Sequence, residues 1–237
     1  MTSEREFILS RIREALRVPA PRLGSHGGHD VVGQASSLPQ TGKMPVPLPV
    51  SRWLPKVGET FDERVALFKT NADALKAEFH FVNSQEEAMA RLQSVRDKEN
   101  WKRIASHRGQ LTDAACAVLG LPTLITDSGY DVNELEKCDA GLTECDALVA
   151  QTGSVVVTSR SAGGRALSVL PPHHVVLARR EQLLADLPGA FELLAKKYGA
   201  NYPSFMSFIT GPSRTGDIER ILVLGAHGPK KLTIICF

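Results

Sequence analysis

The sequence lacks both a long apolar run and an excess of charge of one sign. No stretch of about 18 apolar residues occurs, which excludes a transmembrane helix on length. The 28 basic and 26 acidic residues nearly cancel and leave a net charge of +2. Proteins that bind the nucleic-acid backbone usually carry a clear basic surplus. We therefore expect neither a membrane span nor a nucleic-acid partner.

Cysteine is scarce, and its spacing fits no metal motif. The four cysteines are Cys116, Cys138, Cys145 and Cys236. Because no C-x-x-C or H-E-x-x-H occurs, we expect no metal site and no cofactor bound by this chain. The chain also begins without the apolar segment of a secretory signal. These features predict a cytoplasmic protein with free thiols. Cys145 is a candidate nucleophile, with an inert buried thiol as the commoner alternative.

The composition divides the chain into three regions. Residues 1–18 have a capping pair and apolar residues at helical spacing, which predicts an N-terminal helix. Residues 19–50 are rich in glycine and proline and predict a flexible arm, with a polyproline recognition motif as the alternative. Residues 51–237 contain enough apolar sequence to form one folded domain.

Short apolar runs alternate with capped helical segments in this third region. Thr60 with Glu63, and Ser84 with Glu87, have the spacing of a capping box at a helix start. Two further helices are expected at 112–119 and 181–198, where Pro188 should kink or divide the second. Strands are expected at 79–82, 101–105, 122–126, 147–150, 154–159, 175–178, 205–210, 221–224 and 232–237. The alternation predicts an α/β fold with a mostly parallel sheet flanked by helices.

The first candidate site is the turn Thr152-Gly153-Ser154 between two of these strands. Glycine permits a positive φ or a close approach to a ligand, and the hydroxyl groups can bind an acceptor. A plain β-hairpin turn explains the same residues equally simply. Both interpretations stay open.

The second candidate site is the Gly-Gly loop of residues 159–166, followed by two adjacent histidines. Its arginines, including Arg165, could bind a carboxylate or phosphate, and a solvated hairpin tip is the alternative. His173 and His174 should point to opposite faces of an extended strand, so they cannot easily chelate one metal. One of them facing a cleft could donate a hydrogen bond or carry a proton; a structural histidine is the alternative.

The third candidate site is the segment 210–219, which contains Ser213 and Arg214. It follows a strand and leads into a helix or turn, so its amides and Arg214 could bind an anion. Helix capping by Thr215 or Asp217 is the alternative. His227 lies in a further glycine-bounded loop. None of these segments is a Walker loop, a dinucleotide fingerprint or a serine-hydrolase elbow.

These segments resemble the LUD domain of the lactate-utilization proteins, specifically their small C-type subunit. The resemblance covers about residues 53–237 and rests on GLTECDALVAQTGSVVVTSRSAGGRALSVLPPHHVVLA and FITGPSRTGDIERILVLGAHGPKKLTIICF. It implies a fold like that of ribose-5-phosphate isomerases, CoA transferases and 5-formyltetrahydrofolate cyclo-ligases. It also implies a role in oxidising L-lactate to pyruvate, beside two partner subunits that carry iron–sulfur clusters.

One residue departs from the family pattern. Many members carry an acidic residue where this chain has Gln151, and a glutamine amide can act neither as a base nor as a nucleophile. The sequence thus leaves three hypotheses: a ligand-binding or organising subunit of a lactate-oxidising assembly, a stand-alone enzyme for a small anionic, phosphorylated or CoA-linked substrate, and a scaffold. The expected ligand is lactate-like, phosphate or CoA-like. The expected ligand-binding residues are Thr152, Gly153, Ser154, Arg165, His173, Ser213, Arg214 and His227.

Overall fold

The computed structural model describes residues 56–215, 223–224 and 227–237. The N-terminal helix and the arm predicted for residues 1–50 lie outside the described residues, as does most of the predicted anion-binding turn after Thr215. Within the described part of the chain, no helix is long and apolar enough to cross a membrane.

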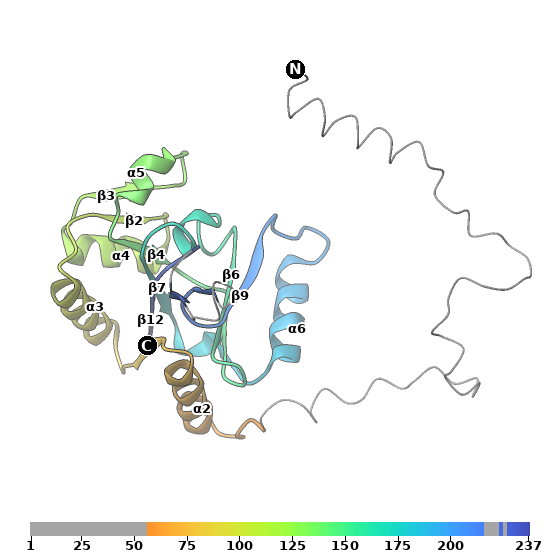
Figure 1. The fold of residues 1–237 in the computed structure, drawn as a ribbon. Helices are drawn as coiled ribbons and strands as arrows, with labels where there is room; N and C mark the ends of the chain where they lie inside the picture. Colours follow the sequence, from red (N-terminus) through yellow and green to blue (C-terminus); the bar gives the residue numbers. More distant parts are fainter. Residues whose placement is uncertain (1–55, 216–222, 225–226) are drawn as a thin grey trace, which may run out of the picture. The chain divides into compact units, whose positions relative to one another are not determined.

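The main sheet has six strands in the order β1-β12-β7-β4-β2-β3, and each neighbouring pair is parallel (Figure 1). The predicted fold class, an α/β protein with a mostly parallel sheet, is therefore confirmed. The strands are β1 (Glu78–Phe81), β2 (Ile104–Ser106), β3 (Thr123–Ile125), β4 (Ala140–Thr143), β7 (His173–Ala178) and β12 (Lys231–Cys236).

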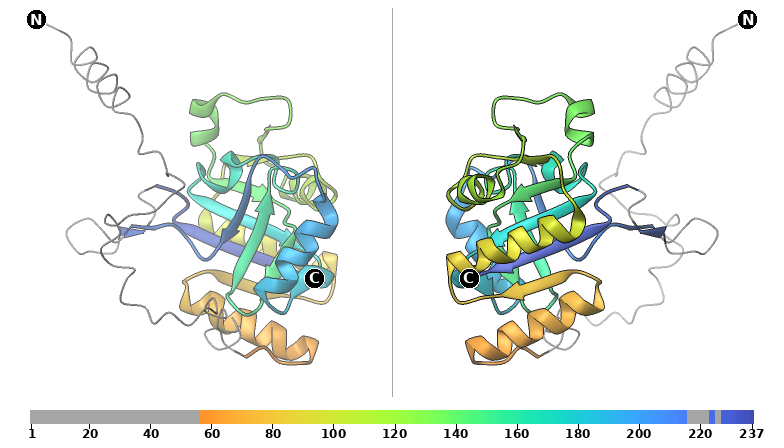
Figure 2. Two further views of the ribbon diagram at one scale, coloured as in Figure 1. Left: turned by 90° about the vertical axis from the view of Figure 1, so that its right-hand side faces the viewer. Right: turned by 90° about the vertical axis from the view of Figure 1, so that its left-hand side faces the viewer.

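Two helices, α3 (Gln85–Glu99) and α4 (Gln110–Leu119), cover one face of this sheet. The hydroxyl of Ser84 caps α3 by accepting a hydrogen bond from the amide of Glu87, as its spacing predicts. The buried side of the helix packs with side chains of β2, β4, β7 and β12 in one apolar cluster. In the right-hand view of Figure 2, α3 crosses in front of β12.

A second sheet covers the other face of the main sheet. Its strands are β8 (Leu183–Leu184), β5 (Ala147–Val149), β6 (Ser154–Thr158) and β9 (Met206–Ile209), in the order β8-β5-β6-β9. Side chains of β6, β7 and β12 form one core with α2 (Phe61–Ala74), which begins at the predicted capping box of Thr60 and Glu63. Helix α6 (Leu187–Tyr198) packs on the outer face of the second sheet (Figure 2).

Smaller elements complete the described chain. They are α5 (Val132–Glu136), the 3-10 helices η2 (Ala166–Ser168) and η3 (Arg180–Gln182), and the antiparallel pair β10 (Arg214–Thr215) and β11 (Val223–Leu224). Leu135 of α5 packs with η2 against β2, on the face of the main sheet opposite α4.

The helix predicted for residues 181–198 is wrong in its first part. Residues 183–184 form β8, which pairs in parallel with β5, and the helix begins only at Leu187. Asp186 caps this helix by accepting a hydrogen bond from the amide of Gly189, at 2.9 Å. Pro188 lies in the first turn, where the missing amide hydrogen costs no helical hydrogen bond. The proline therefore marks a helix start rather than a kink.

Candidate functional site

Strands β2 and β4 are neighbours whose chains leave the sheet in opposite directions. From β2 the chain runs through α4 to β3, whereas from β4 it runs through the second sheet to β7 on the other side. Ligands in open α/β sheets gather at the carboxyl ends of strands at such a switch point. His107 follows β2 directly and Glu144 follows β4 directly, so both lie at this point.

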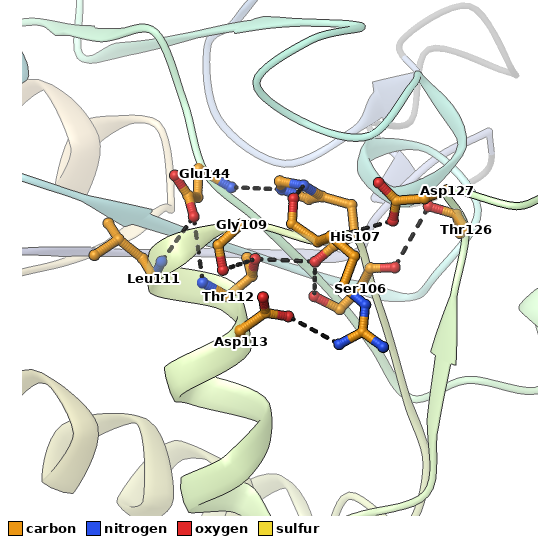
Figure 3. A network of polar contacts seen from close by, with 10 residues as sticks. Ser106, His107, Gly109, Leu111, Thr112, Asp113, Thr126, Asp127 and Glu144 are labelled. Atoms are coloured by element: carbon orange, nitrogen blue, oxygen red, sulfur yellow. Dashed lines mark hydrogen bonds and ion pairs between the residues drawn. The ribbon is translucent and has the colours of Figure 1, made fainter.

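The ring of His107 is buried and hydrogen-bonded through both nitrogens (Figure 3). Its Nε2 accepts from the amide of Glu144 at 3.2 Å, so the ring proton lies on Nδ1, 3.0 Å from the carbonyl oxygen of Arg108. Gly163, from the Gly-Gly loop, packs on this ring with φ +60°. A Cβ at Gly163 would lie 2.3 Å from the Cβ of His107, so the loop and the histidine fit only with glycine.

The carboxylate of Glu144 occupies the amino end of α4. It accepts hydrogen bonds from the amides of Leu111 at 2.7 Å and Thr112 at 3.4 Å (Figure 3). The residue before the helix, Gly109, has no side chain that could cap it. A helix start attracts negative charge, and here a carboxylate of the protein itself fills the position. Arg108 is paired with Asp113 at 3.2 Å, so its charge is also balanced within the chain.

A cavity of about 200 Å³ lies near the amino ends of β7 and β12. Its walls come from η2, β7, the end of β9 and the segments on either side of the β10–β11 pair. The lining residues are Ser168, Val169, His174, Ile209, Gly211, Pro212, Ser213, His227, Gly228, Pro229 and Leu232. Most of these are apolar, and two hydroxyl groups and two imidazole rings supply the polar contacts.

The neighbouring histidines of β7 point to opposite faces of the main sheet, as expected from their spacing. His174 lines the cavity, and its Nε2 lies 2.8 Å from the hydroxyl of Thr143. His173 lies beneath the helices, edge-on to Trp101, with its Nε2 2.8 Å from the hydroxyl of Thr233. Burial lowers the pKa of His173 to about 4 and that of His174 to about 3. Both rings are therefore neutral near pH 7.

Each of these two rings has an Nδ1 atom without a hydrogen-bond partner among the described residues. Buried polar atoms are nearly always paired in folded proteins, so each such atom needs an explanation. His174 is among the residues that line the cavity, but its Nδ1 atom has less than 1 Å² of accessible surface.

The structure brings together two of the residues predicted from the sequence, Ser213 and His227, in the wall of this cavity. The amide of Ser213 donates to the carbonyl of Pro229 at 2.9 Å, which holds the two loops side by side. A Cβ at Gly228 would lie 3.0 Å from the Cβ of Ser213, so the approach of these loops leaves little room.

The predicted turn Thr152-Gly153-Ser154 is the tip of the β5–β6 hairpin, which confirms the hairpin interpretation. Gly153 has φ +66° and packs against Asn71 of α2. The hydroxyl of Ser154 bonds to those of Thr152 and Thr210, each at 2.8 Å. Ligand binding by this turn stays a prediction, since its three residues do not line the cavity.

The two predicted arginines lie elsewhere. Arg165 is exposed, with its guanidinium carbon 5.7 Å from the centre of the Phe205 ring. Arg214 is exposed and donates to the carbonyl of Leu75, at the end of α2. Neither lines the cavity. The eight predicted residues thus lie in several places, and only Ser213 and His227 line the cavity.

His107 and Glu144 were not predicted as site residues, and of the histidine pair the sequence favoured His173 rather than His174 as the ligand-binding residue. A signal existed for the first two, because each directly follows a short buried strand, but β4 carries the small residues Ala140 and Gly141 and was not predicted as a strand. His173 and His174 are consecutive in a strand, so one of them faces each side of the sheet. Which side held the cavity depended on loops distant in sequence.

The fold is that of an α/β protein with a parallel main sheet and a small cavity whose lining is mostly apolar. The family model of the LUD domain matches residues 65–236. The chain therefore belongs to the LUD-domain family, as the resemblance of its glycine-rich segments implies.

Similar proteins agree with this assignment. A protein named lactate utilization protein C from Shouchella clausii is 34% identical over 110 residues, 46% of this chain and 48% of the relative. One of the same name from Deinococcus radiodurans is 31% identical over 118 residues, 49% of this chain and 55% of the relative. The matched segment thus spans about half the length of each. A crystal structure of a DUF162 family protein from Deinococcus radiodurans shares the fold, with a TM-score of 0.57 and 22% identity, covering 76% of this chain and 99% of that one.

Proposed function

We propose that this chain is a non-redox subunit of a system that oxidises L-lactate to pyruvate. The single observation that carries the proposal is its similarity to proteins named lactate utilization protein C, within a family match over residues 65–236. The chain would bind a small ligand or organise partner subunits, and the iron–sulfur clusters would belong to those partners.

The state of the thiols supports placing the redox centres elsewhere. All four cysteines are free, and three of them are buried. Burial raises the pKa of all four thiols, to about 12 for Cys236 and strongly for Cys145. An iron–sulfur cluster needs several cysteine thiolates in one place, and here the cysteines are spread over three apolar clusters, with only Cys145 and Cys236 in the same one. Burial also counts against Cys145 as a nucleophile, since its thiol stays protonated.

A deletion strain tests the role in lactate metabolism. Removing the gene from its host should abolish growth on L-lactate as the sole carbon source and leave growth on pyruvate unchanged, because only the oxidation step is lost. Complementation with the intact gene should restore growth. Unchanged growth of the deletion strain on L-lactate, with no second copy of the gene in the host, would contradict the proposal.

The alternative hypothesis, a stand-alone enzyme for a small anionic, phosphorylated or CoA-linked substrate, is less well supported. Its natural place is the switch point between β2 and β4, where the carboxylate of Glu144 already occupies the helix start. A second negative charge there would be repelled. Turnover of such a substrate by the isolated chain would nevertheless favour this alternative over the subunit role.

A further inference from the structure

Strand β1 forms one edge of the main sheet. It pairs with β12 on its inner side, and among the described residues no strand pairs with its outer side. The amide of Val82, just after β1, donates to the carbonyl of Cys236 at 2.9 Å. Because the backbone groups of successive residues point alternately to the two sides of a strand, Phe79 and Phe81 direct their amide and carbonyl groups toward the outer side. An edge with free backbone groups can take up a further strand.

A depression of about 320 Å³ lies against this outer side. Its lining comes from three elements: Phe79 and His80 of β1, Lys69 of α2, and Ser94 and Lys98 of α3. In the right-hand view of Figure 2, β1 lies between these two helices. The depression therefore reaches from one helix to the other across the edge of the sheet, where an added strand would lie.

Positive charges outnumber negative ones around the depression. Lys69, Arg91 and Lys98 line it, together with Asp73 and Glu78. Lys98 pairs with Glu78 at 2.9 Å, whereas no ion pair of Lys69 or Arg91 is found in the described part of the chain. The side chains of Lys69 and Arg91 are exposed and can bind an incoming carboxylate.

His80 lies within this positive surrounding, and its side chain is 26% exposed. Burial lowers the pKa of its ring, the charges of Arg91, Lys98 and Lys69 lower it further, and the charge of Glu78 raises it. Positive charges from both helices thus act on one ring of β1. A negative group bound at this edge would be stabilised by the same charges.

The charges also restrict which strand can be added. Charged side chains beside an edge strand prevent two copies of a protein from pairing edge to edge. A second copy of this chain would bring a second set of positive charges to the edge, and like charges repel. A strand that carries carboxylates is attracted instead.

We propose that the outer edge of β1 binds an extended, acidic segment of another protein, which adds a strand to the main sheet. Main-chain hydrogen bonds to Phe79 and Phe81 fix the segment, and its carboxylates bond to Arg91 and Lys69. The inference goes beyond the lactate role and does not depend on it, because it concerns the kind of partner and no substrate.

The first test is a titration of the purified full-length chain with a blocked peptide in which glutamate and threonine alternate. One control peptide has lysine in place of glutamate, and the other keeps the glutamates but has N-methylated central peptide groups, which cannot pair with a strand. The first peptide should bind, and each control should bind about tenfold more weakly or less, for lost charge pairs or lost main-chain hydrogen bonds. No binding of the glutamate peptide, or equal binding of either control, would overturn the assignment.

Nuclear magnetic resonance of the same samples locates the contact. The glutamate peptide should shift the backbone amide signals of Phe79 and Phe81 and raise the pKa of the His80 ring, because it brings negative charge to the edge. Inorganic phosphate serves as the small-anion control. A shift of His80 with phosphate as large as with the peptide, or unmoved amides of β1, would show a small-anion site instead of strand addition.

Variants with reversed charge separate this edge from the net charge of the chain. Arg91→Glu and Lys69→Glu alter exposed side chains of the depression, so the fold should be kept, and each should weaken binding of the glutamate peptide by about fivefold or more. Lys196→Glu makes the same change of net charge at an exposed position of α6 and should leave binding unchanged. An equal loss in all three variants, or full binding in Arg91→Glu, would contradict the site.

The outcomes distinguish this inference from the proposed function. A deletion strain that cannot grow on L-lactate, together with a purified chain that binds no acidic peptide, leaves the subunit role intact and refutes strand addition at β1. Binding at β1 by a chain whose deletion leaves growth on L-lactate unchanged refutes the lactate role and retains the docking edge.

Discussion

Two neighbouring histidines, His173 and His174, are buried on opposite faces of β7 and are held in the neutral form. In an unfolded chain their pKa is near 6.5, whereas burial lowers it to about 4 and about 3 in the folded protein. Between these values and pH 6.5 the unfolded chain binds more protons than the folded one. The protonation of these two histidines therefore does not lower the free energy of unfolding above pH 6.5. The free energy of unfolding decreases as the pH falls below 6.5.

We expect the free energy of unfolding to fall by about 2 kcal/mol for each of these histidines between pH 7.5 and pH 5. Urea denaturation at the two pH values measures the change. His173→Phe and His174→Phe should each remove about half of the decrease in unfolding free energy that these two histidines cause. A pH dependence that is the same in both variants as in the parent chain would show that neither ring is buried in the neutral form.

The packing of the Gly-Gly loop on His107 requires glycine at position 163. Its φ is +60°, and a Cβ there would collide with the Cβ of His107. Gly164 also has a positive φ, of +105°, but nothing lies within 4 Å of its added Cβ. We expect Gly164→Ala to cost about 1 kcal/mol for backbone strain alone, and Gly163→Ala to cost about 1–3 kcal/mol more for the clash. Equal unfolding free energies of the two variants would contradict the packing of Gly163 on His107.

At the scale of elements, the start of α4 depends on a residue from another strand. Gly109 offers no capping side chain, and Glu144, just after β4, accepts the hydrogen bonds of the first helical amides. This contact joins α4 to β4 across 33 positions of sequence. It also fills the position at the switch point that a bound anion would take.

We expect Glu144→Ala to lower the free energy of unfolding by about 1–2 kcal/mol, because it leaves helical amides without an acceptor. Glu144→Gln keeps a side-chain oxygen and should cost less. Thermal or urea denaturation of the two variants measures the difference. A Glu144→Ala protein as stable as the parent would show that water replaces the carboxylate without cost.

The capped helices could be predicted from the sequence, but the central strand β4 could not. Thr60 with Glu63, and Ser84 with Glu87, are local patterns, and α2 and α3 begin where they indicate. Strand β4 is four residues long, and its small side chains give no apolar pattern. Gly141 is required because a Cβ there would lie 2.4 Å from the carbonyl oxygen of Leu167, a contact no local pattern reveals.

At the scale of the whole molecule, the residues predicted to form one site lie on loops in different parts of the fold. Ser213 and His227 meet because the loops flanking the β10–β11 pair are bonded to each other. His173 lies on the other face of the main sheet, and Arg214 is engaged with the end of α2. The motifs name Ser213 and His227, but whether residues so far apart in sequence meet depends on parallel pairing between distant strands.

The central claim is that this chain acts as a non-redox subunit beside iron–sulfur partners. The most direct measurement is purification of the tagged full-length chain from lactate-grown cells, with iron content and L-lactate oxidation assayed on the eluate and on the chain expressed alone. The account predicts that iron-containing partners and L-lactate oxidation appear in the first sample, and that both are absent from the second. Robust L-lactate oxidation by the chain alone, or a single iron-free protein from lactate-grown cells, would contradict it.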